Sequence, residues 1–266
     1  MAAAAALSRL TGCDYGRISR VIQDFISSYV SSASAKGVVL GLSGGLDSSV
    51  AAKLCVLALG KDGVFGLVMP AKATPDKDLK DAIALAKRLG IKYGTIDIQP
   101  IIDKFMRSLP PADKKAQGNL AARVRMSILY HHAFIKQHLV VGTSDKSEFY
   151  IGYFSKFGDG GSDLAPIADL YKTQVRALGK FLDVPPSILK KKSSPQLWKG
   201  HLAEKELGID YETLDPILHL LVDKKVVAAI DVARELGISI ETVERVQEMI
   251  NKSAHKRRLA KICYIS

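Results

Sequence analysis

The stretch at residues 41–49, Gly-Leu-Ser-Gly-Gly-Leu-Asp-Ser-Ser, constrains the fold of this chain more than any other segment. An apolar run at residues 37–40 precedes it, and Val50, Leu54, Leu57 and Ala58 follow it at helical spacing. This pattern predicts a buried strand that turns directly into a helix. At such a junction glycines let a ligand approach the backbone, and the first N–H groups of the helix have no intrahelical acceptor. We therefore predict a phosphate-binding loop.

The loop differs from two common phosphate-binding patterns. No lysine follows its glycines as in a Walker A loop, and the Gly-x-Gly-x-x-Gly spacing of a dinucleotide fingerprint is absent. A carboxylate, Asp47, stands inside the loop instead, where it would repel phosphate unless a cation lay between them. We predict that Asp47 binds Mg²⁺, which proteins hold with one or two carboxylates together with phosphate oxygens. The plain alternative is a Gly/Ser turn in which Asp47 only caps the helix.

Strand and helix patterns alternate after this loop. Three more short apolar runs, at 63–69, 93–98 and 139–143, are separated by helical patterns. One of these is a long helix expected from Gly118 to about Gln137, after a loop that includes Lys114 and Lys115. Runs that are apolar throughout indicate a parallel sheet covered by helices, in other words an α/β fold. Because ligands bind beyond the carboxyl ends of such strands, we expect Thr143 and Glu148 near the phosphate loop.

The whole chain adds broader limits. At 266 residues it fits one large α/β domain or two small ones, and its C-terminal part, from about residue 211, is helical throughout. Lysine and arginine exceed aspartate and glutamate by 38 − 27 = +11, so nucleotides, nucleic acids and acidic membranes are all candidate ligands. Three widely spaced cysteines suggest neither a disulfide framework nor a zinc site. Without a signal-like start or an 18-residue apolar run, the expected location is the cytoplasm.

Six motifs in a fixed order carry a resemblance to a known family. They are Ser-Gly-Gly-Leu-Asp-Ser-Ser at 43–49, Gly-Asn-x-x-Ala-Arg-x-Arg-Met at 118–126, Val-Gly-Thr-Ser-Asp-Lys-Ser-Glu at 141–148, Gly-Tyr-Phe-x-Lys-x-Gly-Asp-Gly-Gly-x-Asp at 152–163, Leu-Tyr-Lys-Thr-Gln-Val at 170–175 and His-Lys-Arg-Arg at 255–258. The first resembles the pyrophosphate-binding loop of N-type ATP pyrophosphatases. The whole set, over residues 15–262, resembles the ammonia-dependent NAD synthetases.

The resemblance implies a fold, a reaction and an assembly. The fold is a Rossmann-like, doubly wound parallel sheet of the adenine nucleotide alpha hydrolase-like kind, expected as a single domain over residues 1–266 without the amidase (glutaminase) domain of glutamine-dependent forms. The enzyme would use ATP, Mg²⁺ and ammonia to convert the nicotinic acid carboxylate of deamido-NAD into the amide, releasing AMP and pyrophosphate. The protein would be a homodimer whose dinucleotide site draws on both subunits.

Matched positions assign the site residues. ATP would contact Gly41, Leu42, Ser43, Gly44, Gly45, Leu46, Asp47, Ser48, Thr143, Lys172 and Ser194. Mg²⁺ would be held by Asp47 and Glu148. Deamido-NAD would contact Arg123, Lys156, Asp163, His255 and Lys256.

Three of these residues are predicted to take part in the chemistry, namely Asp47, Lys172 and Asp163. A carboxylate is already an anion at neutral pH, so its attack on phosphorus needs mainly charge neutralisation and alignment, which Mg²⁺ and Lys172 would provide. The attack of ammonia then needs NH₄⁺ to lose a proton in a site that excludes water. We expect the segment at 152–163 to act as a lid and Asp163 to orient the ammonium.

One stretch departs from the family pattern. Where the family usually shows Gly-Gln-Thr-Asp-Glu after a tryptophan, this chain has Gly-His-Leu-Ala-Glu at 200–204, so alanine replaces the first acid and Glu204 remains. If that acid helps to hold a cation or close the lid, this protein compensates differently or binds Mg²⁺ less tightly.

Two other functions compete with this interpretation. Residues 231–243 have the spacing of a helix-turn-helix, which would indicate DNA binding, but Glu241, Glu244 and Glu248 on its second helix are unfavourable next to phosphates. A helical hairpin explains the segment better. A transfer-RNA-modifying ATP pyrophosphatase would use the same loop, but the cysteine pair and appended RNA domain usual in its sulfur-transferring members are not visible.

Overall fold

The computed structural model describes residues 2–196, 198 and 200–265. Its centre is a four-stranded parallel sheet in the order β3-β2-β1-β4. The strands are β1 (Gly37–Gly41), β2 (Val64–Val68), β3 (Lys92–Thr95) and β4 (His138–Val141). The chain steps outward from β1 to β3 and then returns to the other side of β1, so the strand order reverses between β1 and β4. Ligands of such sheets bind at this switch point, beyond the carboxyl ends of the strands.

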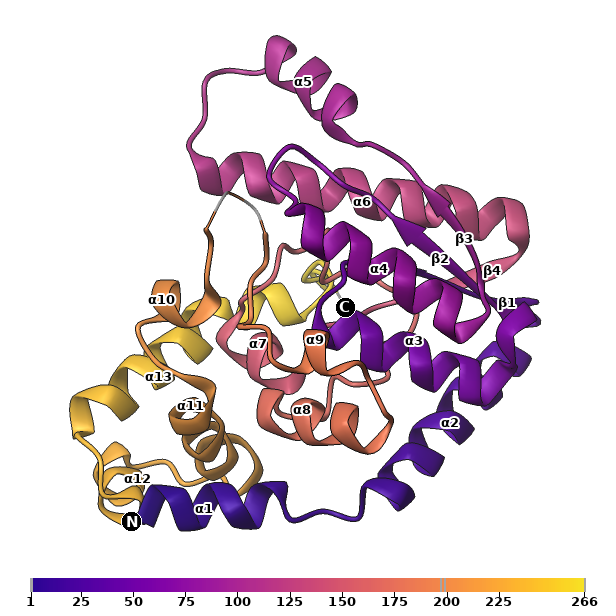
Figure 1. Ribbon diagram of the computed structural model, residues 1–266. Helices are drawn as coiled ribbons and strands as arrows, with labels where there is room; N and C mark the ends of the chain where they lie inside the picture. The colour runs from indigo at the N-terminus through magenta and orange to yellow at the C-terminus, as the bar shows by residue number, and fades with distance from the viewer. Residues whose placement is uncertain (1, 197, 199, 266) are drawn as a thin grey trace.

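Helices cover both faces of the sheet because successive side chains of a strand point to opposite faces. Val38 and Leu40 of β1 pack into one core, whereas Val39, between them, packs into another. The first core includes residues of α2 (Tyr15–Ser32), α3 (Leu46–Leu59), α4 (Asp76–Leu89) and α8 (Lys172–Phe181), and the second includes residues of α5 (Gln99–Ser108) and α6 (Lys114–Lys136). Figure 1 shows α6 on one side of the strands and α3 on the other. The doubly wound α/β sheet predicted from the sequence is confirmed.

The C-terminal helices build a third core beside the sheet, in which Tyr211, Leu214, Val232 and Val243 are fully buried. The remaining elements are α1 (Ala2–Thr11), η1 (Lys61–Gly63), α7 (Lys146–Ile151), α9 (Pro186–Leu189), α10 (Ala203–Leu207), α11 (Tyr211–Leu218), the π-helical turn η2 (His219–Asp223), α12 (Ala229–Leu236), α13 (Ile240–Ser253) and η3 (Ala254–Arg257). In Figure 1, α10 to α13 gather at one end of the molecule, with α1 alongside them. Within the described part of the chain, no helix has both the length and the apolar character needed to cross a membrane.

The structure corrects the expected start of one helix. α6 begins at Lys114, within the stretch predicted as a loop, because the side chain of Asp113 accepts a hydrogen bond from the backbone N–H of Ala116 and caps the helix there. The sequence analysis placed this start at Gly118, which is a buried residue inside the helix. The short helix α7 was also missed, and Asp145 caps it in the same way by accepting from the N–H of Glu148.

The segment with helix-turn-helix spacing is a helical hairpin made by α12 and α13. Val232 and Leu236 of α12 and Val243 and Val246 of α13 are buried in the C-terminal core. The three glutamates that the sequence placed on the second helix, 241, 244 and 248, are exposed. The solvent face of α13 therefore carries negative charges where a DNA-reading helix needs positive ones.

Candidate active site

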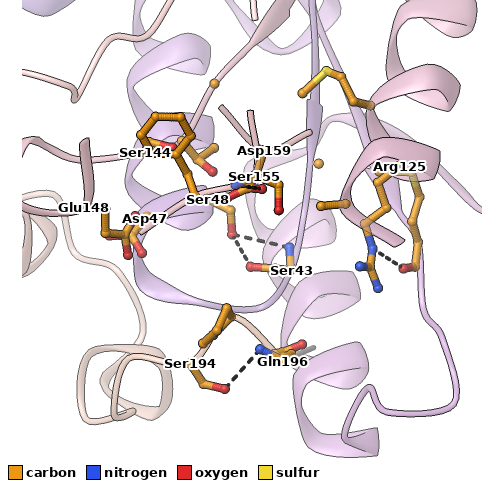
Figure 2. Close-up of a pocket in the computed structure, with 18 of the residues that line it drawn as sticks. Ser43, Asp47, Ser48, Arg125, Ser144, Glu148, Ser155, Asp159, Ser194 and Gln196 are labelled. Carbon is orange, nitrogen blue, oxygen red and sulfur yellow. Dashed lines mark hydrogen bonds between the residues drawn. The ribbon is translucent and has the colours of Figure 1, made fainter. Parts of the chain in front are cut away.

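A cavity of about 490 Å³ lies beyond the carboxyl ends of β1 and β4, where the strand order reverses (Figure 2). Several segments that are distant in the sequence line it, including α6 and the stretch after β2. Four others carry the polar side chains discussed below. They are represented by Ser43, Asp47 and Ser48 from the loop after β1, by Thr143, Ser144 and Glu148 after β4, by Tyr153, Ser155 and Asp159 after α7, and by Ser194, Gln196, His201 and Glu206 around the start of α10. The first two groups are those that the sequence analysis expected to meet.

The loop between β1 and α3 folds back on itself. Ser48 Oγ accepts a hydrogen bond from the backbone N–H of Ser43 (3.3 Å) and donates one to the carbonyl of Gly45 (3.2 Å). Gly44 has a φ of +73°, and a Cβ at this position would lie 2.1 Å from the carbonyl oxygen of Asp78. Only glycine fits there without a shift of backbone. The turn leaves the first N–H groups of α3 without intrahelical acceptors, as a phosphate site requires.

Lys172 joins three helix starts directly behind this loop. Its side chain is fully buried, and its Nζ lies 2.9 Å from Asp47 Oδ2 in the first turn of α3, 2.7 Å from Asp145 Oδ2 at the cap of α7 and 2.8 Å from Glu148 Oε1 in the first turn of α7. Lys172 itself is the first residue of α8. A lysine at a helix start is unfavourable for the helix dipole, so the three carboxylates offset both this effect and the burial of the charge.

Burial and neighbouring charges shift the pKa values of Lys172 and Glu148. Burial alone would lower the pKa of Lys172, but the three carboxylates outweigh it and hold that pKa well above its usual value. Burial also raises the pKa of Glu148 well above normal, with a further rise from Asp145 and Asp47, although Lys172 opposes it. Lys172 is therefore protonated at neutral pH, and the carboxylates still repel one another.

The cluster has the donor set of a site for a hard cation. One oxygen from each of Asp47, Asp145 and Glu148 lies within 4.8 Å of the others. A bound cation would favour the ionised form of all three carboxylates, whose charges would then exceed that of the one ammonium by two. Asp47 Oδ1 is buried without a hydrogen-bond partner. Oxygen ligands, excess negative charge and an unpartnered carboxylate oxygen all fit Mg²⁺. Asp145 was missed in the sequence analysis, although the Asp-x-x-Glu spacing at 145–148 is a helix-start signal that could have found it.

The other residues predicted to bind substrates divide into two groups. Thr143, Ser194 and Lys256 line the cavity, and Lys256 Nζ donates hydrogen bonds to the carbonyls of Gly152 (2.8 Å) and Phe154 (2.9 Å). Arg123, Lys156 and His255 are not among its lining residues but are linked to one another. Arg123 Nε donates to the carbonyl of Lys156 (3.2 Å), and Lys156 Nζ donates to the carbonyl of His255 (2.8 Å).

The two aspartates of the 152–163 segment have different surroundings. Asp163 lies along β4 rather than on the cavity lining, where its Oδ2 accepts from the N–H of Val140 (2.7 Å) and its Oδ1 accepts from the hydroxyl of Tyr130 (3.2 Å). Asp159 lines the cavity, and its Oδ1 accepts from the N–H of Ser155 (3.0 Å). Burial raises the pKa of Asp159. The sequence analysis selected only Asp163, because residues 159 and 163 belong to one motif and spacing does not say which acid faces the ligand.

A family model described as NAD synthase matches residues 18–260, which include the phosphate loop and every member of the Lys172 cluster. The chain belongs to the NAD synthase family. Two similar relatives are described as NH(3)-dependent NAD(+) synthetase. The protein from Hyperthermus butylicus is 49% identical over 255 residues, which cover 95% of this chain and 92% of the relative, and that from Pyrococcus horikoshii is 47% identical over 92% of this chain and 93% of the relative.

Solved structures of the NAD synthase family have the same fold. The structure described as NMN synthetase from Francisella tularensis is 36% identical, with a TM-score of 0.83 over 94% of this chain and 99% of the other. The NH3-dependent NAD synthetase from Campylobacter jejuni, in complex with the nitrate ion, is 33% identical, with a TM-score of 0.82 over 95% of this chain and 100% of the other.

The stretch that departs from the NAD synthase pattern packs against the cavity. Ala203 is buried at the start of α10, and the ring of His201 stacks on Trp198 with centroids 3.5 Å apart. Glu206 lines the cavity one turn after Ala203. Its carboxylate contacts His201 Nε2 (2.6 Å), the Tyr153 hydroxyl (2.9 Å) and Lys115 Nζ (2.7 Å). Burial would raise the pKa of Glu206, but hydrogen bonds from these three partners outweigh it and lower that pKa to about 2.

Proposed function

We propose that this chain is an ammonia-dependent NAD synthetase, which uses ATP to couple ammonia to the nicotinic acid carboxylate of deamido-NAD and releases AMP, pyrophosphate and NAD. The observation that carries the proposal is the Lys172 cluster, which sits directly behind a phosphate loop in a cavity at the switch point of the sheet. The names and the high identity of the relatives support the same reaction.

The first step joins the substrate carboxylate to the α-phosphorus of ATP, and the bond to pyrophosphate breaks. The loop from Gly41 to Ser48 would hold the departing pyrophosphate through its hydroxyls and the N–H groups at the start of α3. Asp47 and Glu148 would hold Mg²⁺, which neutralises phosphate charge when bound. The buried ammonium of Lys172 contacts both carboxylates and keeps them together. The step requires no side-chain nucleophile.

In the second step ammonia attacks the acyl adenylate, and AMP leaves with the bonding electron pair. Ammonium must lose a proton first, so a carboxylate that accepts this proton is expected beside the acyl carbon. Asp163, the sequence-based choice, and Asp159, which lines the cavity, are the two candidates on the predicted lid. The predicted lid packs on α6, where Ser155 Oγ donates to Asn119 Oδ1 (2.5 Å), and this contact supports a role in excluding water.

A homodimer is part of the proposal. Large apolar side chains lie exposed on α2, on α6 and beside Lys156, and such exposed side chains support contact with a second subunit. They are Val21, Phe25, Tyr29, Tyr130, Phe134 and Phe157. The partner would then lie close to Arg123 and Lys156, the two residues predicted to contact the dinucleotide. Free cysteines at 13, 55 and 263 support a reducing location such as the cytoplasm.

A set of parallel incubations tests the reaction. The purified protein receives ATP, Mg²⁺ and either deamido-NAD or nicotinic acid mononucleotide, with ammonium or glutamine as the nitrogen source. We expect NAD from deamido-NAD with ammonium, and no product with glutamine. The mononucleotide is the second candidate substrate because one similar structure is described as an NMN synthetase. Faster turnover of the mononucleotide would favour that activity, and AMP release that is independent of both acceptors would refute the proposed class of reaction.

A further inference from the structure

Asp215 of α11 is a fully buried carboxylate outside the cavity lining. Its Oδ1 accepts a hydrogen bond from the hydroxyl of Ser147 (2.6 Å). Its Oδ2 accepts two from Thr173, one from the backbone N–H (2.9 Å) and one from the hydroxyl (2.7 Å). None of the ion pairs found among the described residues includes Asp215. The carboxyl group is thus held by hydrogen-bond donors alone, at two helix starts.

These donors belong to the segments that carry the Lys172 cluster. Ser147 lies between Asp145 and Glu148 in the sequence, and its Oγ also accepts from the backbone N–H of Lys172 (2.9 Å). Thr173 is the next residue of α8. The first N–H groups of a helix have no partner within the helix, so Asp215 and Ser147 together satisfy two of those of α8. One carboxylate therefore fixes α7 and α8 relative to each other at the residues that meet at Lys172.

An isolated buried carboxylate is unfavourable unless hydrogen bonds compensate it. Simple packing of α11 against α7 and α8 would need only an apolar side chain, as Leu214 and Ile217 beside it provide. Asp215 adds a directional link from the C-terminal helices to the backbone of the cluster.

We propose that Asp215 is a positioning residue for Lys172: by bridging Ser147 and Thr173 it holds the Lys172 ammonium within reach of all three carboxylates. This inference rests on the proposed function. Asp215 contacts neither substrate nor cation, and it acts on the first chemical step through Lys172 and Glu148.

Asp223 offers a matched control. It also links the C-terminal helices to α7 and α8, because its carboxylate contacts Lys146 Nζ (2.7 Å) and accepts from the hydroxyl of Tyr171 (2.9 Å). Its partners are the neighbours of the cluster in the sequence, but none of its hydrogen bonds involves Lys172 or Ser147. Loss of Asp223 therefore weakens the same packing without releasing the backbone of Lys172.

The test compares Asp215→Asn with Asp223→Asn. An asparagine keeps the shape of Asp215 but cannot accept from both Ser147 and Thr173. In single-turnover measurements of AMP formation, we expect Asp215→Asn to lower the rate constant by about 10- to 100-fold, as displacement of a reacting group does. The KM for deamido-NAD should stay within about twofold of the wild-type value, because Asp215 lies away from the residues predicted to contact the dinucleotide. Asp223→Asn should lower the melting temperature but keep the rate constant within about twofold.

A second readout does not depend on activity. Amide hydrogen exchange at residues 172–174 should become faster in Asp215→Asn and remain unchanged in Asp223→Asn. If Asp215→Asn does not fold, Ser147→Ala removes one hydroxyl from the same network and should show the same two effects. A wild-type rate constant in Asp215→Asn, or equal slowing by both variants, would overturn the inference. Failure of the wild-type protein to make NAD would instead refute the proposed function, and the exchange measurement would still report on Asp215.

Discussion

The ammonium of Lys172 lies 2.9 Å from a carboxylate oxygen of Asp47, although one residue opens α8 and the other lies in the phosphate loop at the start of α3. This contact joins the loop after β1 to α8, which follows β4 in the sequence. The cavity is therefore one site assembled from both parts of the chain, and its properties can be tested residue by residue.

Replacement of Lys172 should damage stability and activity together. Lys172→Met leaves three carboxylates without their shared partner, and removal of one member of a buried ion pair costs about 3–5 kcal/mol. Loss of the charge that holds Asp47 and Glu148 together beside the phosphate loop should lower kcat by at least about 100-fold. Urea unfolding and steady-state kinetics measure the two effects. Lys180→Met, at an exposed position on the same helix, is the control and should change neither.

Magnesium should stabilise the protein through the acid cluster. A divalent cation would relieve the repulsion among Asp47, Asp145 and Glu148, so Mg²⁺ should raise the melting temperature of the wild-type protein. Glu148→Gln should abolish this rise and increase the Mg²⁺ concentration needed for half-maximal activity. Glu204→Gln tests the acid that remains in the divergent stretch. An equal loss of the Mg²⁺ effect in Glu204→Gln would add Glu204 to the cation site, and an unchanged effect in Glu148→Gln would move the proposed site away from Glu148.

Two glycines with nearly the same positive φ separate strain from steric overlap. Gly44 and Gly60 have φ values of +73° and +71°, but a Cβ at Gly44 would meet backbone at 2.1 Å, whereas at Gly60 nothing lies within 4 Å. Gly60→Ala should cost about 1–3 kcal/mol from conformation alone, because a ψ of 167° at this φ is a conformation that essentially only glycine adopts. Gly44→Ala should cost more and also weaken ATP binding, because the phosphate loop must shift. Denaturant unfolding and calorimetric titration with ATP distinguish the two variants.

Glu206 should make stability depend on acid pH. Its folded-state pKa of about 2 lies below the usual value of about 4.3 for glutamate. Its contribution to stability is therefore present above about pH 4.3 and is lost as pH falls toward 2. The difference in unfolding free energy between the wild-type protein and Glu206→Gln should be positive at pH 7 and shrink through this window. Glu241→Gln, at an exposed position of α13, should show no such trend.

Ammonium handling can be assigned by comparing the two aspartates of the predicted lid. If Asp163 orients ammonium, Asp163→Asn should reduce turnover about 10- to 100-fold at limiting ammonium, with unchanged affinity for deamido-NAD. If Asp159 does so from the cavity wall, Asp159→Asn should show that defect instead. Initial rates over a range of ammonium concentrations decide between them. Full turnover in both variants would exclude an acid of this segment from that role.

The strand, loop and helix around Asp47 could be predicted because their signals are local. Apolar runs, helical spacing and glycine positions within about twenty residues determine them, and the carboxyl-end rule then brings Glu148 close. The start of α6 was misplaced because a single hydrogen bond from the side chain of Asp113 decides it. The periodic spacing of apolar residues carries no information about such a bond.

The roles of Asp215 and Glu206 could not be predicted because they depend on contacts between distant segments. Asp215 looks like one polar residue in a helix until α11 packs against Ser147 and Thr173. Glu206 likewise gains its partners from α6, from the segment after α7 and from His201. Patterns within the sequence give the faces of helices but not the partners that those faces meet.

The order in which these segments are synthesised has a consequence for the nascent chain. The phosphate loop leaves the ribosome before Lys172, and Asp215 follows later still. Until then Asp47 lacks the ammonium that it contacts in the finished protein. A nascent chain with a complete sheet therefore still lacks the charge arrangement of the Lys172 cluster, which forms only after the segments that follow β4 have been made.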